Sequence, residues 1–292
     1  MSRNILITGK TGYIGNALEK FFIAQGDRVE RLSVRRQTWQ EKDFSKFDVV
    51  IHLAALVHNN TPHARLTDYF KVNYELTKNL ANLVKKAGVN KFIFLSTMSV
   101  YGEEGSLTST VKINRYTKCN PTTYYGLTKY KAETMLEDLA NNQFQVNIIR
   151  PPMVYGKNSP GNFSRLLKMS KINFIYPKIS NQRSVIYIDD LVYHINQLIK
   201  YDGTTLTHPQ NKDYMDTNQT LMLMRKFNDK KPYLLEISYF KFLNKFLNKF
   251  LNKIGIIRKV YGNLVYDKDI DSKYNFEDKR SNFEDTIFKT IK

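Results

Sequence analysis

The feature that most constrains the fold is a glycine-rich turn that directly follows a short apolar run near the N-terminus. Asn4–Thr8 reads as a buried strand, and the glycines of Thr8–Gly15 have the spacing Gly-x-x-Gly-x-x-Gly. Gly9 permits a tight turn, Gly12 lets backbone amides approach a pyrophosphate, and Gly15 lets a helix pack closely on the strand. The N-terminus of that helix would face an anion. The sequence therefore predicts a dinucleotide-binding turn, the alternative being an ordinary strand-to-helix connection.

Apolar runs and amphipathic stretches alternate along the first half of the chain. Five runs read as buried strands: Asn4–Thr8, Arg28–Ser33, Asp48–Leu53, Lys91–Ser96 and Gln145–Arg150. Three longer stretches have helical spacing of apolar residues: Tyr13–Gln25, Ala64–Ala87 and Tyr125–Asn141. Because strands that alternate with helices form right-handed crossovers, the sequence predicts an α/β fold with a Rossmann-type, doubly wound parallel sheet.

Beyond the fifth strand the pattern loosens into segments with frequent Pro and Gly, which suit loops. We expect a smaller C-terminal substrate-binding lobe, with one strand and helix, Ser184–Ile188 and Asp189–Lys200, returning to the sheet. The predicted dinucleotide-binding domain comprises residues 1–153 and 183–203. The predicted lobe comprises residues 154–182 and 204–292.

The chain is strongly basic, with a formal net charge of +18 at pH 7. This excess attracts anions of many kinds, but no nucleic-acid-binding motif accompanies it, so we expect no nucleic-acid partner.

The single cysteine, Cys119, excludes an internal disulfide framework and a cysteine-based zinc site. The sequence shows neither a signal-peptide pattern nor an apolar run long enough to span a bilayer, which predicts a cytoplasmic protein.

A tyrosine and a lysine lie four residues apart at the start of a predicted helix, so they share one helix face. A phenol with an ordinary pKa near ~10 exchanges protons poorly at neutral pH unless a nearby cation stabilises the phenolate. Tyr-x-x-x-Lys alone is common. Here Thr97 follows the fourth strand and lies at the carboxyl edge of the sheet, where ligands of such folds bind. Thr97, Tyr125 and Lys129 are therefore the candidate catalytic residues, with Thr97 orienting a reacting oxygen and Tyr125 moving a proton.

The end of the second predicted strand indicates which dinucleotide fits. An acidic residue there would bind the adenosine ribose and repel a 2′-phosphate. This chain has Ser33 at that point, followed by Arg35 and Arg36, while Glu30 lies too early in the strand. A hydroxyl followed by two cations favours NADP(H) over NAD(H). The alternative is that both arginines are merely solvated.

Further motifs lie in a fixed order along about two-thirds of the chain. They are Thr8–Gly15, His52–Ala55, Asn73, Ser96–Thr97, Val100–Gly102, Tyr125–Lys129, Arg150–Gly156, Arg183 and Tyr187–Asp190. Together they resemble the extended short-chain dehydrogenase/reductases of the NAD-dependent epimerase/dehydratase family. The resemblance implies a nicotinamide-dependent enzyme whose smaller lobe binds a nucleoside diphosphate sugar. It supports the three catalytic roles and implies that Asn73 supports the catalytic helix.

The resemblance also implies the binding residues. The cofactor contacts are Gly9, Thr11, Gly12, Tyr13, Ile14, Gly15, Ser33, Arg35, Arg36, Asp43, Leu53, Ala54, Ala55, Tyr125, Lys129 and Pro152. The substrate contacts are Thr97, Met98, Asn162 and Arg183. We expect no metal site, because His52 and His58 have no further ligand at a suitable spacing. Family members are commonly dimers, which implies a homodimer.

Departures from the family pattern narrow the expected activity. Dehydratases that this chain resembles carry an Asp-Glu pair where Met98 and Ser99 stand, so 4,6-dehydration is not expected. UDP-sugar 4-epimerases usually have the ribose-binding acid that Ser33 replaces. The segments Leu53–Asn60 and Arg150–Gly156 look most similar to reductases of bacterial capsular polysaccharide synthesis. The resemblance thus implies NADPH-dependent reduction of the C4 ketone of a UDP-4-keto-6-deoxy-N-acetylhexosamine, with a UDP-N-acetylfucosamine-type product.

Two alternatives stay open. One is an NAD-dependent UDP-sugar 4-epimerase. The other is a non-catalytic Rossmann-fold nucleotide-binding or interaction protein, although such proteins typically lose the Tyr or the Lys that this chain keeps.

A tandem Phe-Leu-Asn-Lys repeat over Phe242–Lys253 predicts a basic amphipathic helix. Such a helix would lie on an acidic membrane surface, or would pack over the substrate lobe with its lysines in solvent.

Overall fold

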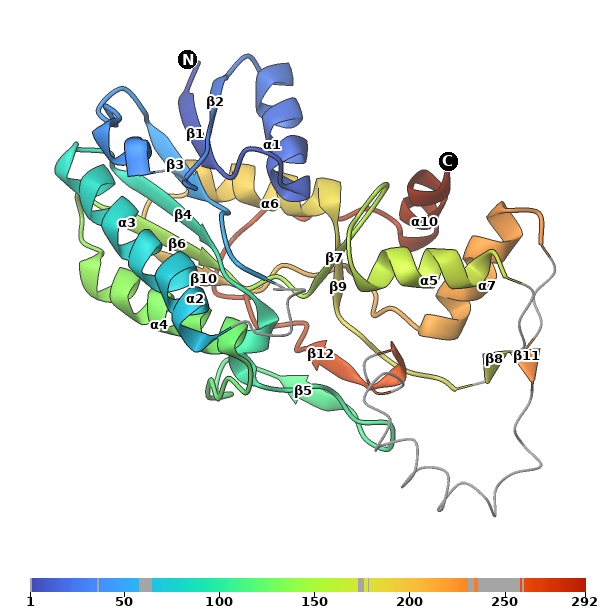
Figure 1. Cartoon of the computed structure of the whole chain (residues 1–292). Coiled ribbons are helices and arrows are strands. Elements are labelled where there is room, and N and C mark those ends of the chain that lie inside the picture. The colour runs from blue at the N-terminus through green and yellow to red at the C-terminus, as the bar shows by residue number, and fades with distance from the viewer. Residues whose placement is uncertain are drawn as a thin grey trace. The chain divides into compact units, whose positions relative to one another are not determined.

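The computed structural model describes residues 2–35, 37–57, 65–172, 176–177, 179–230, 234–235, 258 and 260–292. The chain divides into two compact units, each built from three stretches of sequence (Figure 1). Unit 1 comprises Met1–Gly102, Lys118–Pro151 and Leu191–Pro209. Unit 2 comprises Glu103–Thr117, Pro152–Asp190 and Gln210–Lys292.

Unit 1 is built on a six-stranded sheet whose neighbouring strands all run parallel. The strands are β1 (Asn4–Thr8), β2 (Arg28–Leu32), β3 (Val49–His52), β4 (Lys91–Leu95), β6 (Gln145–Ile149) and β10 (Thr205–Thr207). Their order is β10-β6-β4-β3-β1-β2. The strand order reverses between β1 and β3, and in such sheets ligands bind outside the carboxyl ends of the strands at that point. The predicted Rossmann-type α/β fold is confirmed.

Helices connect these strands. They are α1 (Tyr13–Ala24), the 3-10 helix η1 (Gln37–Glu41), α2 (Leu66–Tyr69), the π-helix η2 (Phe70–Glu75), α3 (Leu76–Lys86), the 3-10 helix η3 (Met98–Tyr101), α4 (Tyr124–Leu139) and α6 (Ile188–Lys200). In Figure 1, α3 and α4 lie on one side of the sheet, and α1 and α6 lie on the other. The four central strands β1, β3, β4 and β6 bury both rows of their side chains, which explains why their sequences are mostly apolar. The edge strands β2 and β10 are more polar.

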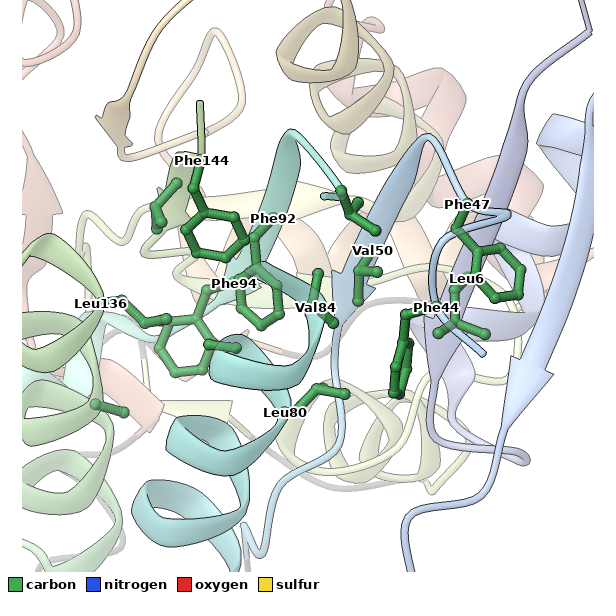
Figure 2. Close-up of a cluster of buried hydrophobic side chains, with 14 of the residues drawn as sticks. Leu6, Phe44, Phe47, Val50, Leu80, Val84, Phe92, Phe94, Leu136 and Phe144 are labelled. Atoms are coloured by element: carbon green, nitrogen blue, oxygen red, sulfur yellow. The ribbon is translucent and has the colours of Figure 1, made fainter. Parts of the chain in front are cut away.

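One cluster of the core of unit 1 lies between the sheet and the helices α3 and α4. Leu6, Val50, Phe92 and Phe94 contribute from three neighbouring strands, and helical and loop side chains meet them (Figure 2). The labelled partners are Phe44, Phe47, Leu80, Val84, Leu136 and Phe144. Each such side chain contributes about 1.5–3 kcal/mol through burial, which holds α3 and α4 against the sheet.

In the residues that the structure describes, unit 2 contains short parallel strand pairs and the helices named below. β5 (Val111–Ile113) pairs with β12 (Leu264–Tyr266), β7 (Met153–Tyr155) with β9 (Val185–Tyr187), and β8 (Tyr176–Pro177) with β11 (Leu234–Leu235). The helices are α5 (Asn162–Ser170), α7 (Thr217–Phe227) and α10 (Phe283–Ile291).

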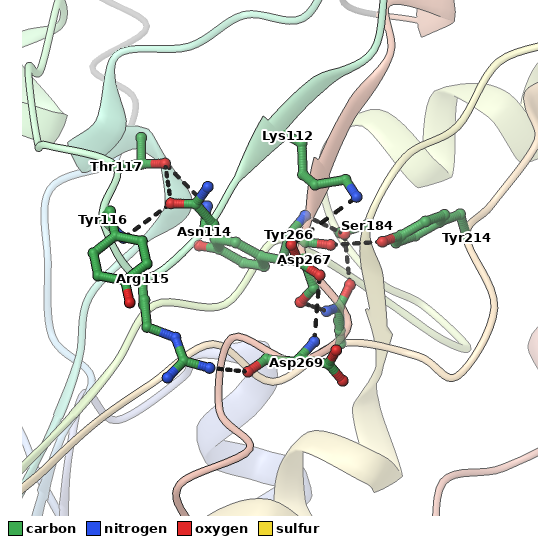
Figure 3. Close-up of polar contacts among 11 residues, drawn as sticks. Lys112, Asn114, Arg115, Tyr116, Thr117, Ser184, Tyr214, Tyr266, Asp267 and Asp269 are labelled. Carbon is green, nitrogen blue, oxygen red and sulfur yellow. Dashed lines mark hydrogen bonds and ion pairs between the residues drawn. The ribbon is translucent and has the colours of Figure 1, made fainter.

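Polar contacts fasten the β5 segment to the C-terminal part of unit 2 (Figure 3). Arg115 donates a hydrogen bond to the carbonyl oxygen of Asp269 at 3.3 Å, and the Lys112 ammonium lies 4.0 Å from the Asp267 carboxylate. The stretch Glu103–Thr117 therefore leaves unit 1 and belongs to unit 2, although both of its sequence neighbours belong to unit 1.

The organisation differs from the sequence prediction in four places. Ser184–Ile188 does not return to the main sheet, because β9 pairs with β7. The sixth strand is instead β10, whose sequence Thr-Leu-Thr has no apolar run. Residues 103–117, 152–153 and 183–190, predicted in the dinucleotide-binding domain, group with unit 2, while 204–209 group with unit 1. The single helix predicted over Ala64–Ala87 is broken into α2, the π-helix and α3.

Among the helices that the structure describes, none is long and apolar enough to cross a membrane. The Phe242–Lys253 repeat lies outside the described residues.

Candidate active site

The glycine-rich turn joins β1 to α1 at the carboxyl edge of the sheet, and Thr11, Tyr13 and Ile14 belong to it or to the first turn of α1. Gly9 has a φ of +93°, a conformation that favours glycine. Gly12 is the N-cap residue of α1, and a Cβ built on it would meet no atom within 4 Å. The turn thus offers the backbone amides of a helix N-terminus beside open space, as an anion site requires.

Arg31 of β2, which the sequence analysis did not single out, fastens this turn. Its guanidinium donates to the carbonyl oxygen of Gly9 from Nε (3.1 Å) and from Nη2. Nη1 donates to Asn16 at 3.0 Å and to Glu19 at 3.1 Å. A Cβ on Gly15 would lie 2.4 Å from Nη2, so this glycine makes room for Arg31. The sequence shows only a cation within a predicted strand, which does not indicate these contacts.

The residues after β3 lie against the same turn. The backbone N–H groups of Leu53 and Ala54 donate to the hydroxyl of Thr8 at 3.1 and 3.2 Å. A Cβ on Gly9 would lie 3.9 Å from the Ala54 Cα. The structure therefore brings together two of the predicted cofactor-binding segments, the glycine turn and Leu53–Ala55.

The candidate catalytic residues lie at the end of β4 and on α4. Thr97 caps η3, where its Oγ1 accepts a hydrogen bond from the Ser99 N–H at 3.1 Å. Gly126 follows Tyr125 on α4, and a Cβ on it would lie 2.5 Å from the Ser99 carbonyl oxygen. The two elements approach this closely because residue 126 has no side chain. Lys129 lies one helical turn beyond Tyr125.

Burial changes the pKa of both ionisable candidate catalytic residues, Lys129 and Tyr125. Lys129 is 1% exposed, with Nζ 3.7 Å from the centroid of the Phe94 ring. Burial lowers the pKa of the Lys129 ammonium to about 7, although the Glu133 carboxylate acts in the opposite direction. Burial raises the pKa of the Tyr125 phenol to about 12, and its contact with the Thr97 hydroxyl acts in the opposite direction. In the protein alone, burial thus outweighs any stabilisation of the phenolate by Lys129.

Glu133, the acid that supports the charge of Lys129, is itself paired with a cation. Arg150, directly after β6, donates from Nη2 to Glu133 Oε2 at 2.6 Å and from Nε to both carboxylate oxygens at 3.1 and 3.2 Å. Its Nη1 donates to the Tyr101 hydroxyl at 2.8 Å. Glu133 is 1% exposed and Arg150 6% exposed. This is a buried ion pair one turn from Lys129, which sequence spacing does not reveal.

The end of β2 carries no carboxylate that faces solvent beside Ser33. Ser33 and Arg35 are both exposed, and Arg36 lies outside the described residues. Glu30, the nearest acid of the strand, forms an ion pair with Lys42.

The remaining predicted site residues divide between the units. Asp43 is exposed in unit 1, where hydrogen bonds from Ser45 hold the pKa of its carboxyl below the usual range. Met98 begins η3 beside Thr97. Pro152, Asn162 and Arg183 belong to unit 2. Asn162 is the first residue of α5, and Arg183 donates to a backbone carbonyl of the same unit at 2.7 Å.

Unit 1 has donors that fit a nicotinamide dinucleotide. The glycine turn presents helix amides to open space, with no acidic residue in the first turn of α1. The buried Lys129 ammonium makes no hydrogen bond to any residue that the structure describes, which leaves its donors for hydroxyls of a ribose. In the described part of the chain, no group of three or more His, Cys, Asp or Glu side chains could hold a metal ion.

The chain is similar to known proteins in sequence. Residues 5–205 match the model of the NAD dependent epimerase/dehydratase family. The UDP-glucose 4-epimerase of Vibrio cholerae is 34% identical over 217 residues, which cover 66% of this chain and 65% of that protein. The N-acetyl-alpha-D-glucosaminyl-diphospho-ditrans,octacis-undecaprenol 4-epimerase of Escherichia coli O157:H7 is 25% identical over 266 residues, covering 82% and 76%. The match to the Vibrio cholerae protein thus spans just under two thirds of its length.

A solved structure shares the fold over nearly the whole chain. It is the dTDP-4-dehydrorhamnose reductase from Bacillus anthracis str. Ames in complex with NADP, with a TM-score of 0.76 and coverage of 99% of both chains. The identity is 17%, so this likeness concerns the fold alone.

Proposed function

This chain belongs to the NAD dependent epimerase/dehydratase family, and we propose that it is an NAD(P)-dependent enzyme that transfers a hydride at C4 of a sugar carried on a diphosphate. One observation carries the proposal: a phenol, Tyr125, lies beside the Thr97 hydroxyl with the buried Lys129 one turn further along α4. All three belong to the unit that carries the glycine turn.

The chain's own residues would control the proton at the reacting oxygen. A bound nicotinamide cofactor supplies the hydride chemistry. In the direction of ketone reduction, the Tyr125 hydroxyl donates its proton to the C4 oxygen, and the Thr97 hydroxyl donates a hydrogen bond to the same oxygen as negative charge develops there. Lys129 stabilises the phenolate that is left. In the direction of oxidation, the phenolate takes the proton of the C4 alcohol.

The finer form of the proposal is NADPH-dependent reduction of a UDP-4-keto-6-deoxy-N-acetylhexosamine. Its support is the end of β2, where Ser33 replaces a ribose-binding acid and the cation Arg35 is exposed nearby. A 2′-phosphate is not repelled there and gains a cation.

The second candidate is an NAD-dependent 4-epimerase acting on a sugar diphosphate. The relatives from Vibrio cholerae and Escherichia coli are both 4-epimerases by name. The same three residues serve this reaction, because it consists of an oxidation followed by a reduction at C4 with the cofactor retained.

The test mixes the full-length protein with NADPH and a UDP-4-keto-6-deoxy-N-acetylhexosamine, follows the reduced nicotinamide absorbance, and identifies the sugar product. Tyr125→Phe removes the proposed proton donor. Tyr124→Phe is the matched control, since it removes the neighbouring hydroxyl of a side chain that is 52% exposed. A parallel reaction contains NAD and a UDP-hexose.

Stoichiometric loss of NADPH in the wild type and in Tyr124→Phe, abolished in Tyr125→Phe, supports the reductase. Interconversion of UDP-hexoses at C4 without net cofactor turnover supports the epimerase. If neither reaction occurs although a nicotinamide nucleotide binds, the enzymatic proposal fails.

We also propose that the basic Phe242–Lys253 repeat contacts an acidic membrane surface. The Escherichia coli relative is named for an undecaprenol-linked substrate, and each unit of the repeat contains two apolar residues and a lysine. Salt-sensitive sedimentation of the full chain with anionic vesicles, but not with zwitterionic ones, is the expected result. Equal sedimentation with both kinds of vesicle, or no sedimentation with either, contradicts the proposed membrane contact.

A further inference from the structure

Buried hydrogen bonds begin at the point where the strand order of the main sheet reverses. Thr8 and His52 are register partners at the carboxyl ends of β1 and β3, and Thr8 Oγ1 lies 2.7 Å from His52 Nδ1. On the other side of the ring, His52 Nε2 lies 2.9 Å from Oγ1 of Thr77 in α3. The Thr77 hydroxyl donates to the carbonyl oxygen of Asn73 at 2.8 Å. All four residues are at most 1% exposed, so the imidazole joins the two strands to the helices that follow β3.

From Asn73 the contacts continue to α4. Asn73 Nδ2 donates to Thr128 Oγ1 at 3.1 Å, and the Thr128 hydroxyl donates to the backbone carbonyl oxygens of Tyr124 and Tyr125 at 2.8 and 3.1 Å. Asn73 belongs to the π-helix η2, an irregularity of the kind that often marks a functional site. The contacts therefore connect the residue before the glycine turn with the first turn of the helix that carries the candidate proton donor.

Counting protons along these contacts fixes the state of the imidazole. The Thr8 hydroxyl accepts from the N–H groups of Leu53 and Ala54, so both of its lone pairs are used and its own proton is donated to His52 Nδ1. The Thr77 hydroxyl donates its proton to a backbone carbonyl, so it can only accept from His52 Nε2. Two independent constraints thus require the same form, a neutral ring protonated at Nε2.

The surroundings of the ring favour the same neutral form. The ring lies between Phe92 and Phe94, at centroid distances of 6.0 and 5.9 Å. Burial, assisted by the nearby Lys129 ammonium, lowers the pKa of His52 to about 3. A charged imidazole would also leave Thr8 facing an N–H group with no lone pair to accept it.

We propose that His52 is a positioning residue which, in its neutral Nε2–H form, holds the glycine turn and the segment after β3 in register with the helix of Tyr125 and Lys129. Thr8 and Thr77 are its two fixed partners. The inference deepens the proposed function, because both the turn and the helix serve a nicotinamide cofactor in that proposal. Its first test needs neither cofactor nor sugar.

The first measurement is nuclear magnetic resonance of the histidine ring nitrogens in the full ¹⁵N-labelled chain, which contains five histidines. We expect one ring with a protonated Nε2 and an unprotonated Nδ1 that does not titrate between pH 8 and about 4. The signal is assigned by its loss in His52→Phe, or by its displacement in Thr77→Val where the first variant does not fold. An Nδ1–H form, or a titration midpoint near 6, overturns the inference.

The second measurement is the affinity for NADH and NADPH by fluorescence titration. Thr77→Val keeps the side-chain shape but leaves the His52 N–H unpaired, and we expect the Kd to rise about tenfold. Thr290→Val is the matched control, because the buried Thr290 hydroxyl also donates to a carbonyl four residues earlier, at 2.7 Å, in unit 2. His52→Gln, which keeps one donor and one acceptor, should bind more tightly than His52→Phe.

Equal Kd values for the wild type and for folded Thr77→Val and His52→Phe overturn the positioning role, even where the ring has the expected protonation. If the wild type binds no nicotinamide nucleotide, the proposed function fails. The resonance experiment separates that failure from a failure of the inference, because it reports the protonation and the partners of the His52 ring without any nucleotide.

Discussion

The close approach of α4 to η3 leads to a sharp prediction for Gly126→Ala. The new Cβ would lie 2.5 Å from the Ser99 carbonyl oxygen, whereas ordinary contacts begin near 3.4 Å. The start of α4 must therefore move by about 0.9 Å, and it carries the Tyr125 phenol away from Thr97. A displacement of about 1 Å in a reacting group can cost roughly 10²-fold in rate. We expect kcat to fall about 10²-fold.

Stability should change much less than activity in this variant. Overpacking costs about 1–3 kcal/mol, but alanine is favoured over glycine in a helix by about 1 kcal/mol. The net loss is then about 0–2 kcal/mol, measurable by urea unfolding beside Thr134→Ala on the exposed part of the same helix. The Kd for the nicotinamide nucleotide should change much less than kcat, because the glycine turn is untouched and Lys129 lies one helical turn beyond the displaced start of α4. A folded Gly126→Ala protein with kcat within twofold of wild type would refute the reasoning.

Three further predictions concern unit 1. Gly12→Ala should change the free energy of unfolding by less than about 1 kcal/mol. Its φ is −73° and its Cβ meets nothing, which favours alanine, but alanine is a weaker N-cap residue than glycine. Calorimetric titration should nevertheless show nucleotide affinity at least tenfold weaker; an unchanged Kd would place the pyrophosphate elsewhere. Lys129 has a pKa of about 7, so it is charged below that pH and loses its charge above it. Nucleotide affinity should therefore fall as the pH rises from 6 to 8.5, and Lys129→Met should remove this dependence on pH. An equal dependence in both proteins would exclude Lys129 as its cause. Glu133→Gln leaves the buried Arg150 guanidinium without its carboxylate partner and should lower the free energy of unfolding in urea by roughly 3–5 kcal/mol. A decrease of less than about 1 kcal/mol would contradict the buried ion pair.

The main architecture could be predicted because its signals are local. Buried parallel strands produce apolar runs, and the glycine spacing follows one of them directly, so β1, its turn and α1 can be located from the sequence. Tyr125 and Lys129 were found because a helix repeats every 3.6 residues. The sixth strand, Thr205–Thr207, could not be found, since it is short and two of its three residues are polar.

The contacts that organise the candidate site are not local. Arg150 and Glu133 lie on a strand end and a helix, and nothing in their spacing predicts that they meet. Arg31 reads as a surface cation until the fold places α1 above it. The sequence argues against His52 as a metal ligand and does not indicate its contacts. His52 is buried, and its hydrogen bonds to Thr8 and Thr77 depend on the register of β1 with β3 and on the position of α3.

The packing of Arg31 against Gly15 makes the two positions epistatic. A methyl group at residue 15 would displace the guanidinium, whose hydrogen bonds to Gly9, Asn16 and Glu19 would then be lost. In a background with a shorter apolar residue at position 31, the same methyl group would find space. Related chains that carry a side chain at the third glycine should therefore also lack the arginine, and a substitution that one member of the family tolerates would be deleterious in this one.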